Sequence, residues 1–323
     1  MNYSEIVVTL GNKCTAQCEI CCLDANMSYN TGIDVTKIKE FLLSAEQVKQ
    51  IHTIHFSGGE AFLYYDTLVE LVKTCSSIKK KTTVITNGFW AKNKEMVDEK
   101  LRVLKEAGLF AIGTSYDEYH QKYVPVENIR NLIVGAKKVG LKTSIQAVIV
   151  RDSRNGDWID ALGEDLTDVA VDFITCDKAG KAKENILDSQ FIRKISSKGC
   201  VCRKGASFSI LYDGSLWPCC APSVFETGLS VGNIYNDIKT VKDALAQLEK
   251  NLILKVLRNK GFDFFREIME EQELIAVPDN VISSCELCQL FFGREQMKQL
   301  APYIIEKISK DPNCIIRRKQ HEI

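Results

Sequence analysis

The sequence predicts an α/β fold, a partial (β/α)6 barrel of the TIM type followed by a smaller C-terminal domain. Three observations favour this class. Strand-like apolar runs alternate with helix-like runs over residues 1–185, the pattern of parallel βαβ units. Glycines and polar residues follow the strands, where the active site of such a barrel lies. Residues 186–323 break the alternation with a hairpin, helices and spaced cysteines.

Six strands are expected, with a helix before each strand from the second onward. Short apolar runs predict the strands, and longer runs with helical spacing of apolar residues predict the helices. The expected strands cover residues 6–10, 53–56, 82–86, 110–114, 142–150 and 169–175. The expected helices cover residues 34–52, 68–79, 94–107, 129–139 and 158–166.

The C-terminal domain is expected to begin with a β-hairpin. Residues 207–212 and 215–216 alternate like strands around Asp213-Gly214, and an Asp-Gly pair between such runs is a strong turn signal. Residues 238–271 are helix-like with a break at Gly261, and residues 317–323 are expected to form a solvated tail.

Composition describes an ordinary globular protein. Of 323 residues, 45% are apolar, and 42 basic side chains balance 42 acidic ones, so neither nucleic acid nor an anionic membrane is an expected partner. No apolar run reaches membrane-spanning length, and the first ten residues do not resemble a signal peptide. Thirteen cysteines then indicate metal or redox chemistry in a reducing cytoplasm, rather than disulfides.

A C-x3-C-x2-C run, formed by Cys14, Cys18 and Cys21, directly follows the first expected strand. Three thiolates can hold three irons of a 4Fe–4S cluster, whereas a complete set of cysteine ligands numbers four. One iron would therefore stay open for another ligand. A zinc loop or a group of reduced core cysteines is the alternative, although structural zinc sites need a fourth ligand and are usually built from paired ligands.

Together with Gly58-Gly59-Glu60 at the end of the second expected strand, this run resembles the radical SAM superfamily over about the first 180 residues. The resemblance implies that S-adenosylmethionine (SAM) chelates the open iron and is cleaved to a 5′-deoxyadenosyl radical, chemistry that belongs to the cofactor. The residues implied to bind the cofactor are Ile20, Gly58, Gly59, Glu60 and Ser115. For Ser115 the alternative is a structural role, a hydrogen bond at the end of its strand.

The C-terminal third resembles the auxiliary-cluster (twitch or SPASM-like) domain of peptide-modifying radical SAM enzymes. The mark of that domain is C-x(9–15)-G-x4-C followed by a later cysteine pair. Cys202, Gly214 and Cys219 satisfy it, and Cys285 and Cys288 form the pair. The resemblance implies a second 4Fe–4S cluster on four thiolates. Structural zinc is the alternative, because four paired cysteines also suit zinc.

Two more cysteines stand beside this ligand set. Cys200 also fits the spacing to Gly214 and stays an alternative to Cys202. Cys220 is left over, and a free cysteine is usually a small buried hydrophobe. Radical SAM peptide epimerases instead use a free cysteine to return a hydrogen atom to Cα, and residues 217–227 resemble the epimerases that make epipeptides.

This resemblance implies that Cys220 is the hydrogen donor in the conversion of L- to D-residues. It also implies a ribosomal precursor peptide as substrate and an external electron donor of the flavodoxin or ferredoxin type. A maturase that forms thioether or carbon–carbon crosslinks is an alternative with the same build. A non-catalytic iron–sulfur or zinc scaffold is a third hypothesis from another class.

Substrate contacts are expected at the barrel mouth and in the auxiliary domain. Asp117, Tyr119 and His120 follow the fourth expected strand and are candidates for holding the peptide. Ser207 stands where the relatives are expected to have an acidic residue, so this contact, or the peptide itself, is expected to differ. The first strand begins almost at residue 1, so peptide recognition is expected from these regions or from a separate protein.

Overall fold

The computed structural model describes residues 3–202 and 205–315, so the tail expected at residues 317–323 lies outside these ranges. Within them, a nine-stranded sheet has the order β10-β9-β8-β1-β2-β3-β4-β5-β6. Strands β1 to β6 pair in parallel, which confirms the predicted α/β class with a partial TIM-type barrel. These strands are β1 (Glu5–Thr9), β2 (Thr53–Ser57), β3 (Lys81–Thr86), β4 (Leu109–Ser115), β5 (Lys142–Ile149) and β6 (Ala170–Thr175).

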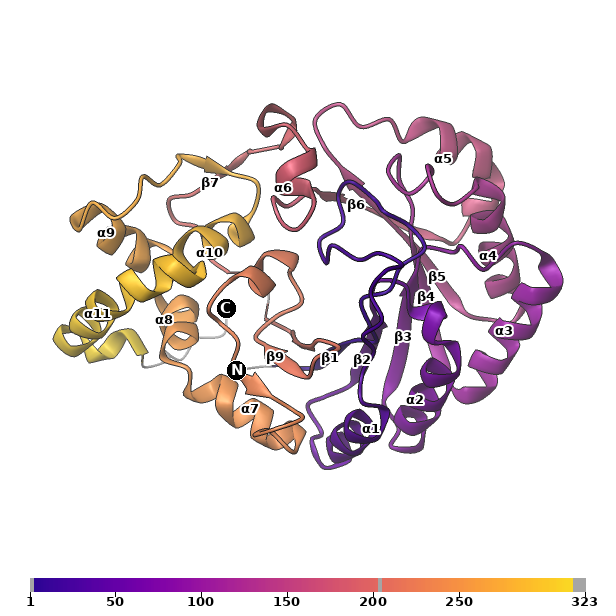
Figure 1. Cartoon of the computed structure of the whole chain (residues 1–323), viewed down its shortest axis with the longest axis horizontal. Helices are drawn as coiled ribbons and strands as arrows, with labels where there is room; N and C mark the ends of the chain where they lie inside the picture. The colour runs from indigo at the N-terminus through magenta and orange to yellow at the C-terminus, as the bar shows by residue number, and fades with distance from the viewer. Residues whose placement is uncertain (1–2, 203–204, 316–323) are drawn as a thin grey trace, which may run out of the picture.

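Five helices cover the outer face of this parallel sheet (Figure 1). Alternate residues of the strands, such as Ile6 and Val8, are fully buried and pack with the apolar faces of α1 and α2 in one core. Period-two burial in the strands and period-3.6 burial in the helices account for this layering. The helices are α1 (Val35–Leu43), α2 (Tyr65–Ser77), α3 (Lys94–Ala107), α4 (Val126–Lys138) and α5 (Gly156–Leu162).

Two expected helices are wrong in extent. The helix expected over residues 34–52 ends at Leu43 and continues as a 3-10 turn, Ser44–Gln47. The run at residues 238–271 is three helices, α7 (Val241–Lys250), α8 (Leu252–Lys260) and α9 (Asp263–Glu271). The Gly261 break is confirmed, but a second break falls at Asn251, whose side chain accepts a hydrogen bond from the Leu254 amide and caps α8.

The predicted hairpin is confirmed as β8 (Ser207–Ile210) and β9 (Ser215–Trp217), with β10 (Gly232–Asn233) beside β9. Strand β8 pairs in parallel with β1, so the hairpin extends the barrel sheet. Phe208, Ile210 and several α7 side chains belong to the same core as β1 and α1. The sheet and this core thus continue past residue 185, while the division of the chain at that point stays a prediction.

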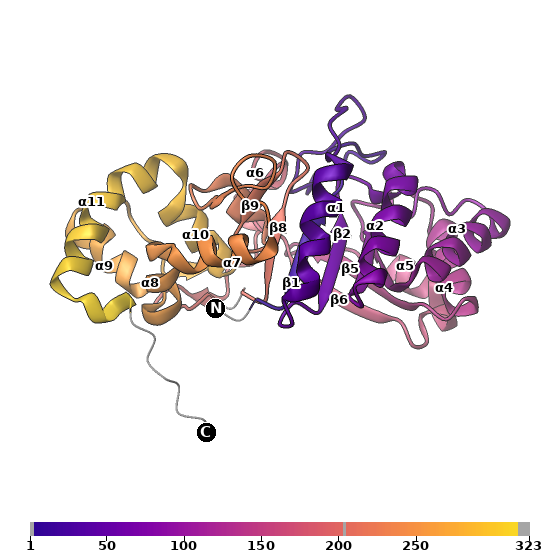
Figure 2. The same ribbon diagram turned by 90° about the horizontal axis from the view of Figure 1, so that it is seen from below.

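The remaining helices form a second layer at the end of the molecule away from α2–α4 (Figure 2). Their core is rich in phenylalanine, including Phe262, Phe265, Phe291 and Phe292. No helix in the described ranges has the length and apolar character needed to cross a membrane. This layer includes α10 (Ser284–Phe292) and α11 (Arg294–Lys310). The other elements of this part of the chain are α6 (Ala182–Asn185), β7 (Ile195–Ser196) and β11 (Asn280–Val281), and α6 lies nearer the barrel, where Ala182 packs in one apolar cluster with Cys14 and Cys18.

Candidate active site

The loop that carries Cys14, Cys18 and Cys21 (residues 11–25, the cysteine loop) is joined to the end of β2 by backbone hydrogen bonds. The Gly59 amide donates to the Gly11 carbonyl at 2.8 Å, and the Glu60 amide donates to the Lys13 carbonyl at 2.8 Å. A Cβ atom on Gly59 would lie 2.3 Å from the Lys13 oxygen. Only glycine therefore permits this approach of the two backbones.

Glu60 is buried, and both of its carboxylate oxygens accept hydrogen bonds. Oε1 accepts from the Phe62 amide at 2.9 Å and the Thr86 hydroxyl at 2.7 Å, and Oε2 accepts from the Asn87 amide at 2.7 Å. Burial raises the pKa of Glu60, and these three hydrogen bonds act against that shift. Its carboxylate thus fixes the residues that follow β3 beside the cysteine loop.

Asn87 follows the third expected strand, on the face where the active site is expected, but the sequence assigned it no role. Its Nδ2 lies 3.6 Å from the Cys14 Sγ and 3.3 Å from the Thr15 hydroxyl oxygen, and both are hydrogen bonds that the amide donates. Its place directly after a strand did not predict a contact with the cysteine loop, because many structural residues occupy such a position. Its amide helps to orient Cys14.

The three thiols of the cysteine loop fit a cluster of iron ions. Cys14 and Cys18 are buried, and the Ala16 and Ala25 amides donate to the sulfurs of Cys14 and Cys21, each at 3.4 Å. Burial raises the pKa of Cys14 to about 12, and the nearby negative charges of Glu60 and the other two thiolates add to the shift. Iron cations bound to these sulfurs would stabilise the thiolate forms and so lower the pKa values.

Among the described residues, no three His, Cys, Asp or Glu side chains converge on a single-ion site. A 4Fe–4S cluster does not need such convergence, because each thiolate binds a different iron. The spread of the three sulfurs around the cysteine loop is therefore compatible with a cluster.

Asp117, which is buried, and His120, which is largely buried, form a pair beside the cysteine loop. Asp117 accepts from the backbone amides of Tyr119, His120 and Val148 at 2.9–3.1 Å and pairs with the His120 Nδ1 at 2.8 Å. Burial lowers the pKa of His120, but hydrogen bonds to Asp117 and Cys18 outweigh it and raise that pKa to about 10. The pair anchors the segment after β4, and its role in substrate binding stays a prediction.

Ile20 and Tyr119 lie close to the same thiols. Both side chains are buried in an apolar cluster with Cys14 and Cys18. Ser115 is the last residue of β4 and is half-buried. These positions leave the implied cofactor and substrate roles of all three residues as predictions.

We expect Asp117→Asn to destabilise the protein by about 3 kcal/mol near pH 6, because removing one partner of a buried ion pair leaves the other charge uncompensated. The pKa of His120 is raised, to about 10, so the stabilisation is complete below the unfolded value near 6.5 and is lost as pH rises through 10. Denaturant unfolding at pH 6 and pH 10 measures both free energies. The loss of unfolding free energy in Asp117→Asn should be smaller at pH 10 than at pH 6. An equal loss at both pH values would contradict a charged Asp117–His120 pair. The control is Glu118→Gln, which changes a half-buried neighbouring carboxylate.

The four cysteines predicted to hold the second cluster are near enough for their charges to influence one another. Burial raises the pKa of Cys288 well above its ordinary value, and the neighbouring charges of Cys219, Cys202 and Cys285 add to the shift. Cys219, with its pKa raised to about 12 by burial, is also influenced by Cys202 and Cys285. A bound cationic group would lower these pKa values, while the ligand roles of the four cysteines, and the choice of Cys202 over Cys200, stay predictions.

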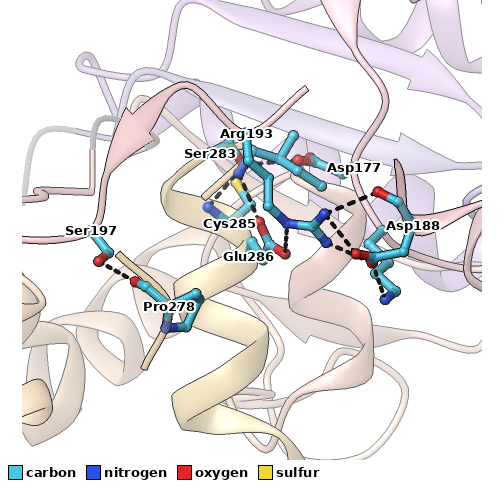
Figure 3. A network of polar contacts seen from close by, with 10 residues as sticks. Asp177, Asp188, Arg193, Ser197, Pro278, Ser283, Cys285 and Glu286 are labelled. Carbon is cyan, nitrogen blue, oxygen red and sulfur yellow. Dashed lines mark hydrogen bonds and ion pairs between the residues drawn. The ribbon is translucent and has the colours of Figure 1, made fainter. Parts of the chain in front are cut away.

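The helix that carries Cys285 and Cys288 is attached to the segment after β6 by polar contacts (Figure 3). The Ser283 hydroxyl caps α10 by accepting from the Cys285 amide at 3.1 Å, and it donates to Asp177 at 2.8 Å. Arg193 Nε donates to Glu286 at 3.0 Å. These contacts fix the N-terminal turn of α10 against the barrel.

Cys220 is exposed and lies beside Ser207, whose hydroxyl donates to the Cys220 Sγ at 3.3 Å. Ser207 is paired with Glu5, the first residue of β1, whereas the cysteine loop follows the last residue, Thr9. Four residues of a strand span about 13 Å. The free thiol and the cysteine loop therefore lie toward opposite ends of β1.

Residues 8–162 match the profile of the Radical SAM superfamily. The parallel barrel and the cysteine loop at the end of β1 agree with this match, which covers slightly less than half of the chain. A radical SAM domain would hold a 4Fe–4S cluster and SAM, and the thiols of Cys14, Cys18 and Cys21 fit that cluster.

One relative is similar over nearly the whole chain. It is YydG of Bacillus subtilis (strain 168), described as a peptide biosynthesis protein, with 28% identity over 306 residues that cover 93% of this chain and 95% of YydG. Among solved structures, BtrN in complex with AdoMet and 2-DOIA matches 81% of this chain and 89% of its own at a TM-score of 0.50 and 14% identity. This structural likeness concerns the fold alone.

Proposed function

We propose that this protein is a radical SAM peptide epimerase, which converts L-residues to D-residues in a ribosomally made peptide. The full-length similarity to YydG, a protein described by its part in peptide biosynthesis, supports a peptide substrate. The observation that carries the choice of epimerisation is the exposed Cys220 thiol, held by Ser207 toward the end of β1 that lies away from the cysteine loop.

When bound, the first cluster and SAM would supply the 5′-deoxyadenosyl radical that removes a hydrogen atom from Cα. Cys220 would then return a hydrogen atom from its S–H group to the other face of Cα, which inverts the residue. Loss of this hydrogen atom would leave a thiyl radical on Cys220, which needs one electron and one proton to become a thiol again. Substrate contacts of Asp117, Tyr119, His120 and Ser207 belong to the same proposal.

The thiols of Cys202, Cys219, Cys285 and Cys288 would hold an auxiliary 4Fe–4S cluster next to the donor. Because Cys219 is adjacent to Cys220 in the chain, an electron accepted at this cluster would have a short path to the spent thiol. A flavodoxin- or ferredoxin-type protein in the cytoplasm would supply that electron and also the electron that the first cluster needs to cleave SAM. Ile20, Gly58, Gly59, Glu60 and Ser115 are proposed to line the SAM side of the site, the glycines through their backbones.

A crosslinking maturase of the same build is the alternative, and mass separates the two. The reconstituted enzyme would be incubated without oxygen with SAM, a reductant and the short peptide encoded beside its gene. Epimerisation leaves the peptide mass unchanged in ordinary water and yields D-residues on hydrolysis. Loss of two hydrogens per event, with only L-residues, would contradict epimerisation and establish a crosslink.

A further inference from the structure

The segment that follows β6 (residues 177–183, the connecting segment) is fitted closely against the cysteine loop. The Lys181 amide donates to the Cys21 carbonyl at 2.9 Å. Gly180 has a φ of +55°, and a Cβ atom there would lie 2.4 Å from the same carbonyl oxygen. This backbone contact transmits any displacement of the connecting segment to the cysteine loop.

Glu226 holds the connecting segment from the other side. It is the last residue of a 3-10 turn, Pro222–Glu226, which begins two residues after Cys220. Its Oε1 accepts from the Gly180 amide at 2.8 Å. Its Oε2 pairs with Lys183 and accepts from the Gln289 side chain on α10.

One carboxylate thus joins three parts of the site. Glu226 contacts the Gly180 amide, in the segment that is hydrogen-bonded to the cysteine loop. The 3-10 turn that carries Glu226 follows Cys220 in the chain, and Gln289, which donates to Glu226, is adjacent to Cys288. In the proposed mechanism, the hydrogen donor and the cysteine loop lie toward opposite ends of β1. The distance between them must stay constant for both to act on the same Cα, and Glu226 joins the segments that set this distance. A misplacement of about 1 Å can reduce a reaction rate about 100-fold.

We propose that Glu226 is a positioning residue that fixes the distance between the Cys220 thiol and the cysteine loop. The inference rests on the proposed function. The Glu226 side chain is 26% exposed and that of Lys183 is 41% exposed, and ion pairs with such exposure contribute little to stability. The contacts therefore set geometry more than they stabilise the fold.

The test compares Glu226→Ala and Glu226→Gln with a control, Glu184→Gln, which changes an exposed carboxylate one residue beyond Lys183. In Glu226→Ala we expect unchanged iron content and SAM cleavage, but about tenfold more 5′-deoxyadenosine formed per D-residue. A displacement smaller than 1 Å should cost less than the roughly 100-fold that 1 Å can cause. We call the number of D-residues formed per 5′-deoxyadenosine the coupling. Glu226→Gln should recover part of the coupling, because its amide oxygen can still accept from the Gly180 amide. The control should match the parent enzyme.

Hydrogen exchange of the protein without peptide gives a second measurement. The amides of residues 180–183 should exchange faster in Glu226→Ala and remain protected in Glu184→Gln. Unchanged coupling, unchanged exchange or loss of iron in Glu226→Ala would each overturn the positioning role. If the parent enzyme forms no D-residue, the proposed function fails, and the exchange measurement still shows separately whether Glu226 holds the connecting segment.

Discussion

The Cys220→Ala variant is expected to cleave SAM as the parent enzyme does and to form no detectable D-residue. Cys220 is exposed, so its replacement should change the free energy of unfolding by no more than about 0.5 kcal/mol. The radical step should persist because the cysteine loop is untouched. The Cα position would lose its hydrogen without a donor on the opposite face, so the peptide should return to the L-form or accumulate other products.

The matched control is Cys22→Ala. Cys22 is also exposed and also follows a predicted cluster ligand, Cys21. We expect this variant to epimerise normally. Full epimerisation by Cys220→Ala would assign the hydrogen donor to another group, and loss of auxiliary iron would mean that Cys220 is a ligand.

Gly59→Ala is expected to empty the first cluster and leave the second in place. The added Cβ would lie 2.3 Å from the Lys13 carbonyl oxygen and 2.7 Å from its carbon. These are backbone atoms that cannot rotate away, so the cysteine loop must move from the end of β2. We expect about half of the parent iron content, on the basis of two 4Fe–4S clusters, and a fall in SAM cleavage of about 100-fold.

Gly156→Ala is the control for this substitution. A Cβ atom on Gly156 meets no atom within 4 Å, and glycine replacement at a compatible helical position is neutral or slightly stabilising. Iron content, the visible absorption of the clusters and SAM cleavage should match the parent protein. If Gly59→Ala also kept full iron and full SAM cleavage, the close approach of the two backbones would not control the cluster.

Local patterns were sufficient for the parallel barrel but not for every connection. The alternating runs and the Asp213-Gly214 turn gave the strands and the hairpin, because both signals lie within a few residues. The pairing of β8 with β1 joins segments about 200 residues apart, and no local pattern specifies such a partner. The break at Asn251 was missed because an asparagine cap differs little from an ordinary polar residue in a helix.

The two groups of predicted cluster ligands could be proposed from the spacing of their cysteines, because a cysteine in such a pattern already indicates metal binding. The acidic residues were harder to assign. Glu60 and Asp117 have their carboxylates engaged by backbone amides in the fold, whereas Glu226 joins three segments. Residue type alone does not distinguish a buried anchor from a ligand-binding group, because the difference lies in partners from distant parts of the chain.

Hydrogen return from an exchangeable thiol is the central step of the proposed reaction. The direct measurement is the reaction of parent enzyme, SAM, reductant and precursor peptide in deuterium oxide, followed by mass and chirality of each residue. We predict one deuterium at Cα of every D-residue and none in the unchanged L-residues. D-residues that carry only ordinary hydrogen at Cα would contradict a solvent-exchanging Cys220 donor.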